Sequence, residues 1–189
     1  FGLNYDYNNL NTLKNNSEIL DDNSRLRTTH SVLMNIGYSI SNRWTVEGLF
    51  TWVNQRRLIS QFGNENLDQT SGIGDAIILV RYAVLNSSKN NWNLEVGAGI
   101  KIPFGSSTET SEQGITLNAD LQPGSNSWDQ VYFLSLAKTF NFRPSMAFSS
   151  RFVYRNTGVN NSYFGNSTYK FGNEIQAFLG VSDQFLIKK

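Results

Sequence analysis

Residues 71 to 105 read SGIGDAIILVRYAVLNSSKNNWNLEVGAGIKIPFG, and two runs of alternating positions flank a short polar turn in this stretch. Successive side chains of a β-strand point to opposite faces, so alternate residues share a face. One face of the first run carries Ala76, Ile78, Val80, Tyr82 and Val84. The matching face of the second run carries Trp92, Leu94, Val96, Ala98, Ile100 and Ile102. The charged residues of both runs lie on the opposite face, so the stretch predicts a hairpin with one apolar side.

The length of the two arms favours a membrane over a soluble core. Each arm has about ten to eleven alternating residues, which is what a tilted strand needs to cross a bilayer, whereas soluble strands cluster near five or six. Tyr82 and Trp92 stand beside the turn on the apolar face, where an interfacial aromatic girdle is expected. The stretch therefore predicts one hairpin of a transmembrane β-barrel, with a soluble up-and-down barrel as the alternative.

The composition excludes several classes of protein. The hydrophobic fraction is 39% and the mean hydropathy is −0.36; no segment approaches eighteen uninterrupted apolar residues, so membrane-spanning helices are not expected. The net charge is +1 with Lys and Arg spread along the chain, which predicts no nucleic-acid partner. His30 is the only histidine and cysteine is absent, so we expect no metal site, no cofactor, no catalytic residues and no enzymatic activity.

Alternation recurs along the whole chain and defines about eight strands. The expected strands outside the opening hairpin are Phe1–Tyr7, Arg27–Ile40, Trp44–Val53, Trp128–Phe140, Met146–Arg155 and Tyr169–Val181, with a further start at Phe185–Ile187. The expected long loops are Asn8–Leu26, Arg56–Thr70, Ser106–Ser127 and Asn156–Thr168. The expected short turns are Ser41–Arg43, Asn86–Asn91, Asn141–Pro144 and Ser182–Gln184. Long and short connections alternate strictly, as in outer-membrane barrels with long extracellular loops and short periplasmic turns.

These patterns predict an all-β, up-and-down antiparallel transmembrane β-barrel, with residues 1–189 as a single domain. Its eight visible strands could be a complete small barrel or part of one with about ten to twelve strands.

The polar face of the strands supplies the candidate functional residues. Burying many charges in a dry core is costly unless each is paired, whereas a water-filled lumen accommodates them. The lumen-facing candidates are Glu47, Asp75, Arg81, Glu95, Lys101, Arg151, Arg155 and Glu174, and Lys170 shares their face. We expect Asp75 to lie within reach of Lys101 or Arg81. Such pairs could stiffen the wall or contact a substrate, and the sequence favours the first.

Three local motifs stand at the ends of the predicted strands. They are Gly72-Ile73-Gly74-Asp75, Lys101-Ile102-Pro103-Phe104-Gly105, and Leu121-Gln122-Pro123-Gly124-Ser125-Asn126-Ser127-Trp128-Asp129. Gly72 and Gly74 predict a bulge that turns the strand inward, and Pro103 marks the end of strand pairing. For Gly97 and Gly99 we favour relief of crowding inside the barrel over room for a ligand or plug.

The three motifs, in this order, resemble the bacterial outer-membrane transporter family named for the meta-pathway of phenol degradation. The resemblance spans Gly72 to Asp129. It implies a monomeric barrel akin to the fatty-acid and toluene channels, with a role in the uptake of hydrophobic or aromatic compounds.

Two functions remain open from the sequence. The first is a channel or transporter for small hydrophobic or aromatic molecules in the outer membrane of a Gram-negative bacterium, in contact with outer-membrane lipid and lipopolysaccharide. The second is a non-transporting accessory or scaffold barrel in a larger outer-membrane protein complex. The bulky apolar residues on the polar face favour the second, because narrow barrels are filled by their own side chains. These residues are Leu33, Leu49, Ile77, Leu79 and Phe133.

Overall fold

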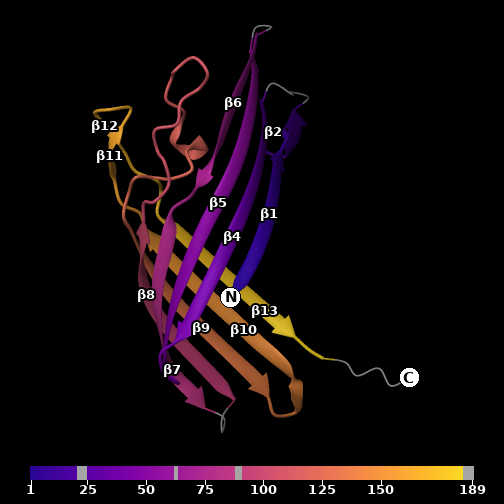
Figure 1. Ribbon diagram of the computed structural model, residues 1–189. Coiled ribbons are helices and arrows are strands. Elements are labelled where there is room, and N and C mark those ends of the chain that lie inside the picture. Colours follow the sequence, from indigo (N-terminus) through magenta and orange to yellow (C-terminus); the bar gives the residue numbers. More distant parts are fainter. Residues whose placement is uncertain (21–24, 62–63, 88–90, 185–189) are drawn as a thin grey trace.

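The computed structural model describes residues 1–20, 25–61, 64–87 and 91–184, and its dominant feature is one strongly curved antiparallel sheet (Figure 1). Eight strands follow one another in the order β1-β4-β5-β7-β8-β9-β10-β13. Their bounds are β1 Gly2–Leu10, β4 Arg25–Ser39, β5 Trp44–Gln61, β7 Ala76–Ser87, β8 Trp92–Ile102, β9 Asp129–Phe140, β10 Arg143–Asn156 and β13 Glu174–Ser182. Within the described residues β1 and β13 do not pair with each other, so the sheet is an open half-barrel. The predicted all-β, up-and-down antiparallel architecture is confirmed.

The predicted loop Arg56–Thr70 is wrong. The strand β5 continues to Gln61, and the chain returns as β6 (Asn64–Ile73), which pairs with the upper half of β5. Polar residues occupy both faces of this extension, with Arg57 opposite Asp68 and Arg56 opposite Gln69. An apolar-polar alternation is therefore absent, although the backbone pairing is regular.

A bulge separates β6 from β7. Between Leu49 and Trp52 of β5 lie two residues, and they face three residues between Ile73 and Ile77. The extra residue reverses which positions point inward, since Thr70 is buried above the bulge and Leu79 below it. Gly74 donates its backbone N–H to the Thr51 carbonyl at 2.8 Å. The bulge predicted from Gly72 and Gly74 is confirmed.

Several further strand boundaries differ from the prediction. The segment Asn8–Leu26 contains the end of β1, the beginning of β4 and a small hairpin of β2 (Leu13–Asn15) and β3 (Glu18–Leu20). The segment Asn156–Thr168 contains most of a second small hairpin, β11 (Asn160–Tyr163) and β12 (Ser167–Tyr169). The last wall strand begins at Glu174 rather than Tyr169, so Lys170 precedes it and is exposed. The expected strand start at Phe185–Ile187 lies outside the described residues.

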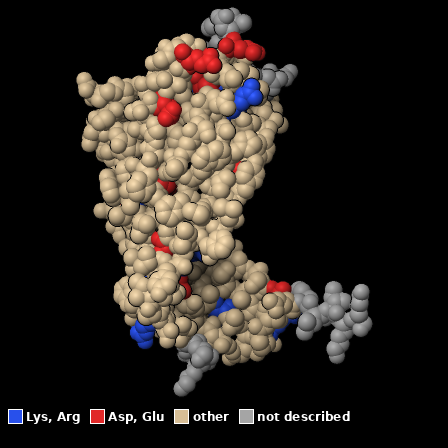
Figure 2. Space-filling view, viewed as in Figure 1, with Lys and Arg blue, Asp and Glu red and all other residues tan. Residues whose placement is uncertain are grey.

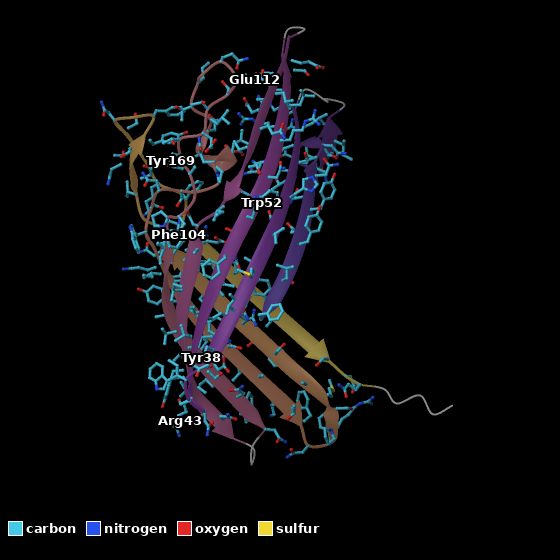
Figure 3. All side chains as sticks on the ribbon, viewed as in Figure 1. Tyr38, Arg43, Trp52, Phe104, Glu112 and Tyr169 are labelled. Atoms are coloured by element: carbon cyan, nitrogen blue, oxygen red, sulfur yellow. The ribbon has the colours of Figure 1, made fainter. Side chains whose placement is uncertain are left out.

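Long and short connections lie at opposite ends of the sheet (Figure 1). Tyr38 and Arg43 mark the short-turn end, and Glu112 and Tyr169 mark the long-loop end (Figure 3). In the predicted turn Asn86–Asn91, residues 88–90 are outside the described part of the chain. Between Ser106 and Ser127 the chain is irregular except for one turn of 3-10 helix, η1 (Ala119–Leu121).

The outer face of the half-barrel is apolar and uncovered. Between its two ends the wall seen in Figure 2 carries few charged side chains, whereas blue and red atoms lie inside the hollow below it. Exposed apolar residues of this face include Val80, Val96, Ile100, Leu134, Phe152 and Leu179. At the short-turn end the Trp44 and Tyr82 rings lie 4.7 Å apart between their centroids. No helix among the described residues is long and apolar enough to cross a membrane.

Candidate functional site

The inner face of the half-barrel carries the candidate residues. A hollow of about 400 Å³ is lined by inward side chains from seven wall strands, including Glu47, Arg81, Arg151, Arg155 and Glu174. A second hollow of about 290 Å³ lies nearer the long-loop end and is lined by Asp75, Lys101 and Arg155. Glu95 lines a third, of about 310 Å³, together with residues of the short turn Ser41–Arg43. The eight candidates therefore lie along the inner wall from one end to the other.

A buried cluster joins the three sequence motifs at the long-loop end, and we call Asp75, Lys101, Ser125, Ser127 and Asp129 the loop latch. The Lys101 side chain is only 7% exposed, and its Nζ lies 2.9 Å from Asp75 Oδ2 and 3.0 Å from Asp129 Oδ2. Lys101 also donates to the Ser125 hydroxyl. One ammonium group thus joins two carboxylates. Of the two partners predicted for Asp75, Lys101 or Arg81, the structure shows Lys101.

Both carboxylates of the loop latch are saturated with donors. Asp75 accepts from the Ser125 backbone N–H at 3.1 Å, from the Ser125 hydroxyl at 2.6 Å and from the Gly105 N–H at 3.2 Å. Asp129 accepts from the Ser127 hydroxyl at 3.1 Å and from the Gly158 N–H at 2.9 Å. Carboxylates satisfied in this way hold chain segments together rather than offer a free ligand site.

The ion pairs continue along the inner wall from the loop latch. Arg155 Nε lies 3.7 Å from Asp129 Oδ2, and Arg155 Nη2 lies 2.7 Å from Glu174 Oε2. This arrangement connects β9, β10 and β13. Asp129 was not among the predicted lumen-facing residues, although it ends the third motif and alternates in phase with Val131 and Phe133. The phase of β9 was the signal that could have identified it.

Close backbone contacts bring the loop onto the wall. A Cβ atom added to Gly124 would overlap the backbone of Gly105, and one added to Gly72 would come within 3.3 Å of the Pro123 ring. Glycines of the first two motifs therefore leave room for the third. The sequence placed each motif at a strand end, but strand order alone did not indicate that residues 121–129 turn inward onto the other two.

The loop also covers the inner face of the β5–β6 extension. The Thr70 hydroxyl donates to the Leu121 carbonyl at 2.6 Å, and Leu121 is fully buried. Arg27 Nη1 lies 2.8 Å from Asp120 Oδ2. The Gln122 side chain donates to the carbonyls of Glu109 and Leu117, each at 3.0 Å. Residues 117–125 are thus fixed against the inner wall at the long-loop end.

The middle of the inner wall has a different character. Arg81 lies 3.3 Å from carboxylate oxygens of both Glu47 and Glu95. Its guanidinium carbon is 5.6 Å from the centre of the Phe133 ring, and that of Arg151 is 5.7 Å from the same centre. Leu79, Val131 and Phe133 form the buried apolar cluster beside them. A mixed surface of charged and apolar groups therefore faces the hollow.

The two glycines of β8 relieve crowding, as favoured from the sequence. A Cβ on Gly97 would come 3.1 Å from Cγ of Arg81 and 3.4 Å from Cβ of Phe133. A Cβ on Gly99 would overlap the Ile78 carbonyl. The absence of a side chain at Gly97 allows Arg81 to lean over Phe133 from two strands away.

The His, Asp and Glu side chains of the described residues show no metal-binding arrangement. No group of three or more His, Cys, Asp or Glu side chains gathers in the described ranges. His30 shares a hydrogen bond of 2.7 Å with the Tyr5 hydroxyl and lies 5.0 Å from the Tyr7 ring centre.

Comparison with known proteins shows the fold. No family model matches the chain, and no curated protein matches it. Among solved structures, the crystal structure of an outer-membrane channel from Pseudomonas putida F1 superposes with a TM-score of 0.58 at 16% sequence identity. The match covers 85% of this chain but 56% of the channel, so the chain spans little more than half the length of this solved relative. The half-barrel thus has the fold of an outer-membrane channel.

Proposed function

We propose that the chain forms the wall of a β-barrel channel that carries small hydrophobic or aromatic molecules across the outer membrane of a Gram-negative bacterium. The observation that carries this proposal is the division between the two faces of the sheet. The outer face is uncovered and apolar, which suits contact with lipid and lipopolysaccharide. The inner face combines the apolar cluster of Leu79, Val131 and Phe133 with charged groups around a hollow.

Three further points support the proposal. The fold is shared with an outer-membrane channel. The three motifs of the loop latch resemble those of the transporter family named for phenol degradation, whose presumed cargo is aromatic. The apolar cluster on the inner wall supplies a surface on which an aromatic solute can lose its hydration shell. We infer no enzymatic activity and no cofactor for such a channel.

Reconstitution of the full-length protein tests the channel function. Purified protein in planar bilayers and in liposomes should give stepwise conductance and should admit 3-phenylpropanamide, a small neutral aromatic solute. A protein that gives neither conductance nor uptake, although it is folded, would contradict the proposal.

Epitope tags test the orientation in the membrane. With the long loops outside the cell, a tag at Gln113 should be detected on intact cells. A tag at Ser88, which lies outside the described residues, should become accessible only after the outer membrane is opened. The reverse pattern would mean an inverted barrel or a protein that is not a membrane barrel.

A scaffold function is the second candidate, and the loop latch favours it. A loop held by a buried lysine and two saturated carboxylates at the long-loop end narrows the interior, as expected for a barrel that transports nothing. Purification in mild detergent separates the two functions. A scaffold subunit should co-migrate with other outer-membrane proteins, whereas a channel should migrate alone and conduct.

A further inference from the structure

We infer that Arg151 and the apolar side chains around it form a binding site for a small hydrophobic molecule that carries a carboxylate. This inference rests on the proposed channel function and specifies its substrate class. We define the Arg151 site by Arg151, Phe133, Leu79, Val131 and Phe178, all of which line the hollow of about 400 Å³ on the inner wall.

The charge of Arg151 is not neutralised by any residue that the structure describes. The other cations of the middle wall and the cation of the loop latch are each within 4 Å of two carboxylates: Arg81 with Glu47 and Glu95, Lys101 with Asp75 and Asp129, and Arg155 with Asp129 and Glu174. Arg151 forms neither an ion pair nor a hydrogen bond within the described residues, and it is exposed to the hollow. A guanidinium group presents a planar fork of donors that matches a carboxylate bidentately.

The surroundings of Arg151 define the rest of the ligand. Its cross-strand neighbours are Ser135 on β9 and Phe178 on β13. Phe133 lies under its guanidinium group, 5.7 Å from the guanidinium carbon, which holds the head group in place over an aromatic face. Leu79 and Val131 continue the apolar surface beside Phe133. A ligand with its carboxylate on Arg151 can therefore lay an apolar body along this surface.

The neighbouring carboxylates do not compete for Arg151. Glu47 and Glu95 both lie against Arg81, and Glu47 also accepts from the Asn35 amide. Glu174 lies against Arg155 and accepts from the Gln176 amide. Each acidic group of the middle wall thus has its own donors. Among the described cations that line this hollow, Arg151 is the one without a carboxylate partner, and an incoming carboxylate would supply it.

Binding of three probes with the same skeleton tests the inference. The probes are 3-phenylpropionate, the neutral 3-phenylpropanamide and the cationic 3-phenylpropylamine, titrated calorimetrically into the folded full-length protein at pH 7.5. We expect the carboxylate to bind about tenfold more tightly than the amide, because charge-assisted hydrogen bonds exceed neutral ones by about that factor. The amine should bind most weakly. Equal affinities for acid and amide, or preference for the amine, would overturn the inference.

Variants of Arg151 connect the preference to this side chain. The change Arg151→Gln should remove the tenfold advantage of the acid over the amide. Arg151→Lys should keep part of the advantage, since it retains the charge and loses the fork. Arg43→Gln is the matched control, because Arg43 lies at the short turn and contacts the Tyr82 hydroxyl at 3.0 Å. Retention of the full preference in Arg151→Gln would overturn the inference.

Conductance and uptake measured on the same proteins separate this inference from the channel function. A protein that conducts and admits the amide without preferring the acid contradicts the Arg151 site alone. A protein that binds the acid through Arg151 but neither conducts nor admits any probe contradicts the channel function alone. As a control for folding, variants are compared only if heating changes their mobility on gels in the same way as it does for the parent protein.

Discussion

The loop latch and the Arg151 site lie on the same inner wall, yet the cation of the loop latch is buried and paired, whereas that of the Arg151 site is accessible and has no carboxylate partner among the described residues. In the loop latch, the Lys101 side chain is 7% exposed and lies against two carboxylates. In the Arg151 site the guanidinium group faces the hollow and has no carboxylate partner among the described residues. An unpaired charge is costly when it is buried, whereas an accessible charge stays hydrated and remains free to bind a ligand. The difference separates the part of the wall that maintains the fold from the part that can bind a solute.

Removal of the buried cation should give the largest effect and break the loop latch. The change Lys101→Met leaves Asp75 and Asp129 without their shared partner, and breaking a buried pair costs about 3 to 5 kcal/mol. Urea unfolding of the protein in lipid vesicles measures this free energy. Lys14→Met, at an exposed position of β2, is the control and should change little. Equal stability of the two variants would mean that the loop latch does not stabilise the fold.

A charge added to the outer face of β8 should give the next largest loss of stability, larger than the removal of a charge from its inner face. Val96 is 38% exposed on the outer face, and an arginine there should cost about 2 to 4 kcal/mol near the bilayer midplane. Glu95→Gln on the inner face should cost much less, because Glu95 is partly exposed and its pairing with Arg81 is long at 3.3 Å.

Cysteine labelling checks the same two positions independently. A water-soluble reagent should modify a cysteine at position 95 and leave one at position 96 protected by lipid. Strong reaction at 96 with protection at 95 would shift the register by one residue and exchange the two faces.

The wall strands were predictable because their two faces differ in polarity. Alternation along Ala76–Val84 and Trp92–Ile102 identified the hairpin that the structure contains as β7 and β8. The β5–β6 extension was missed because both of its faces are polar, and the bulge at Gly74 reverses the phase between Thr70 and Leu79. Alternation with period two cannot be followed along the sequence through such a reversal of phase.

The contacts of the candidate site were predictable only within neighbouring strands. Asp75 and Lys101 belong to one hairpin, so their pairing followed from its register. The return of residues 121–129 onto that pair depends on close packing of Gly105 and Gly124, which no local pattern reveals. The unpaired state of Arg151 likewise depends on where Glu47, Glu95 and Glu174 find their partners. Those partners are Arg81 and Arg155, and the alternation pattern does not say which arginine each carboxylate meets.

Overpacking of the loop should separate the loop latch from the wall without removing a charge. A valine at Gly124 would collide with the Gly105 backbone, and overpacking of this kind costs about 1 to 3 kcal/mol. We expect limited proteolysis within residues 106–118 to accelerate in Gly124→Val while the Arg151 site keeps its ligand affinity. Gly172→Val is the control, since nothing lies within 4 Å of a Cβ at that position. Unchanged proteolysis would show that the loop is not held by this contact.

An ion pair at the short-turn end should give the smallest effect, because it is partly exposed. Arg143 Nε lies 2.7 Å from Asp183 Oδ2, and the Ser145 hydroxyl donates to Asp183 Oδ1 at 2.8 Å. Desolvation by itself raises the pKa of Asp183. The hydrogen bonds from Ser145, Arg143 and the Gln184 backbone, together with the charge of Arg143, outweigh it and hold that pKa below its ordinary value.

The lowered pKa fixes the sign of the pH dependence. A carboxyl group whose pKa is lower in the folded state stabilises the fold above its unfolded pKa of about 3.9 and loses this contribution as the pH falls through the folded pKa. The melting temperature of the parent protein should therefore fall slightly more between pH 5 and pH 2.5 than that of Asp183→Asn. Glu18→Gln, at an exposed position of β3, should show the parent's pH dependence. If Asp183→Asn also keeps the parent's dependence, the partly exposed pair contributes nothing, and only buried pairs such as those of the loop latch hold the wall together.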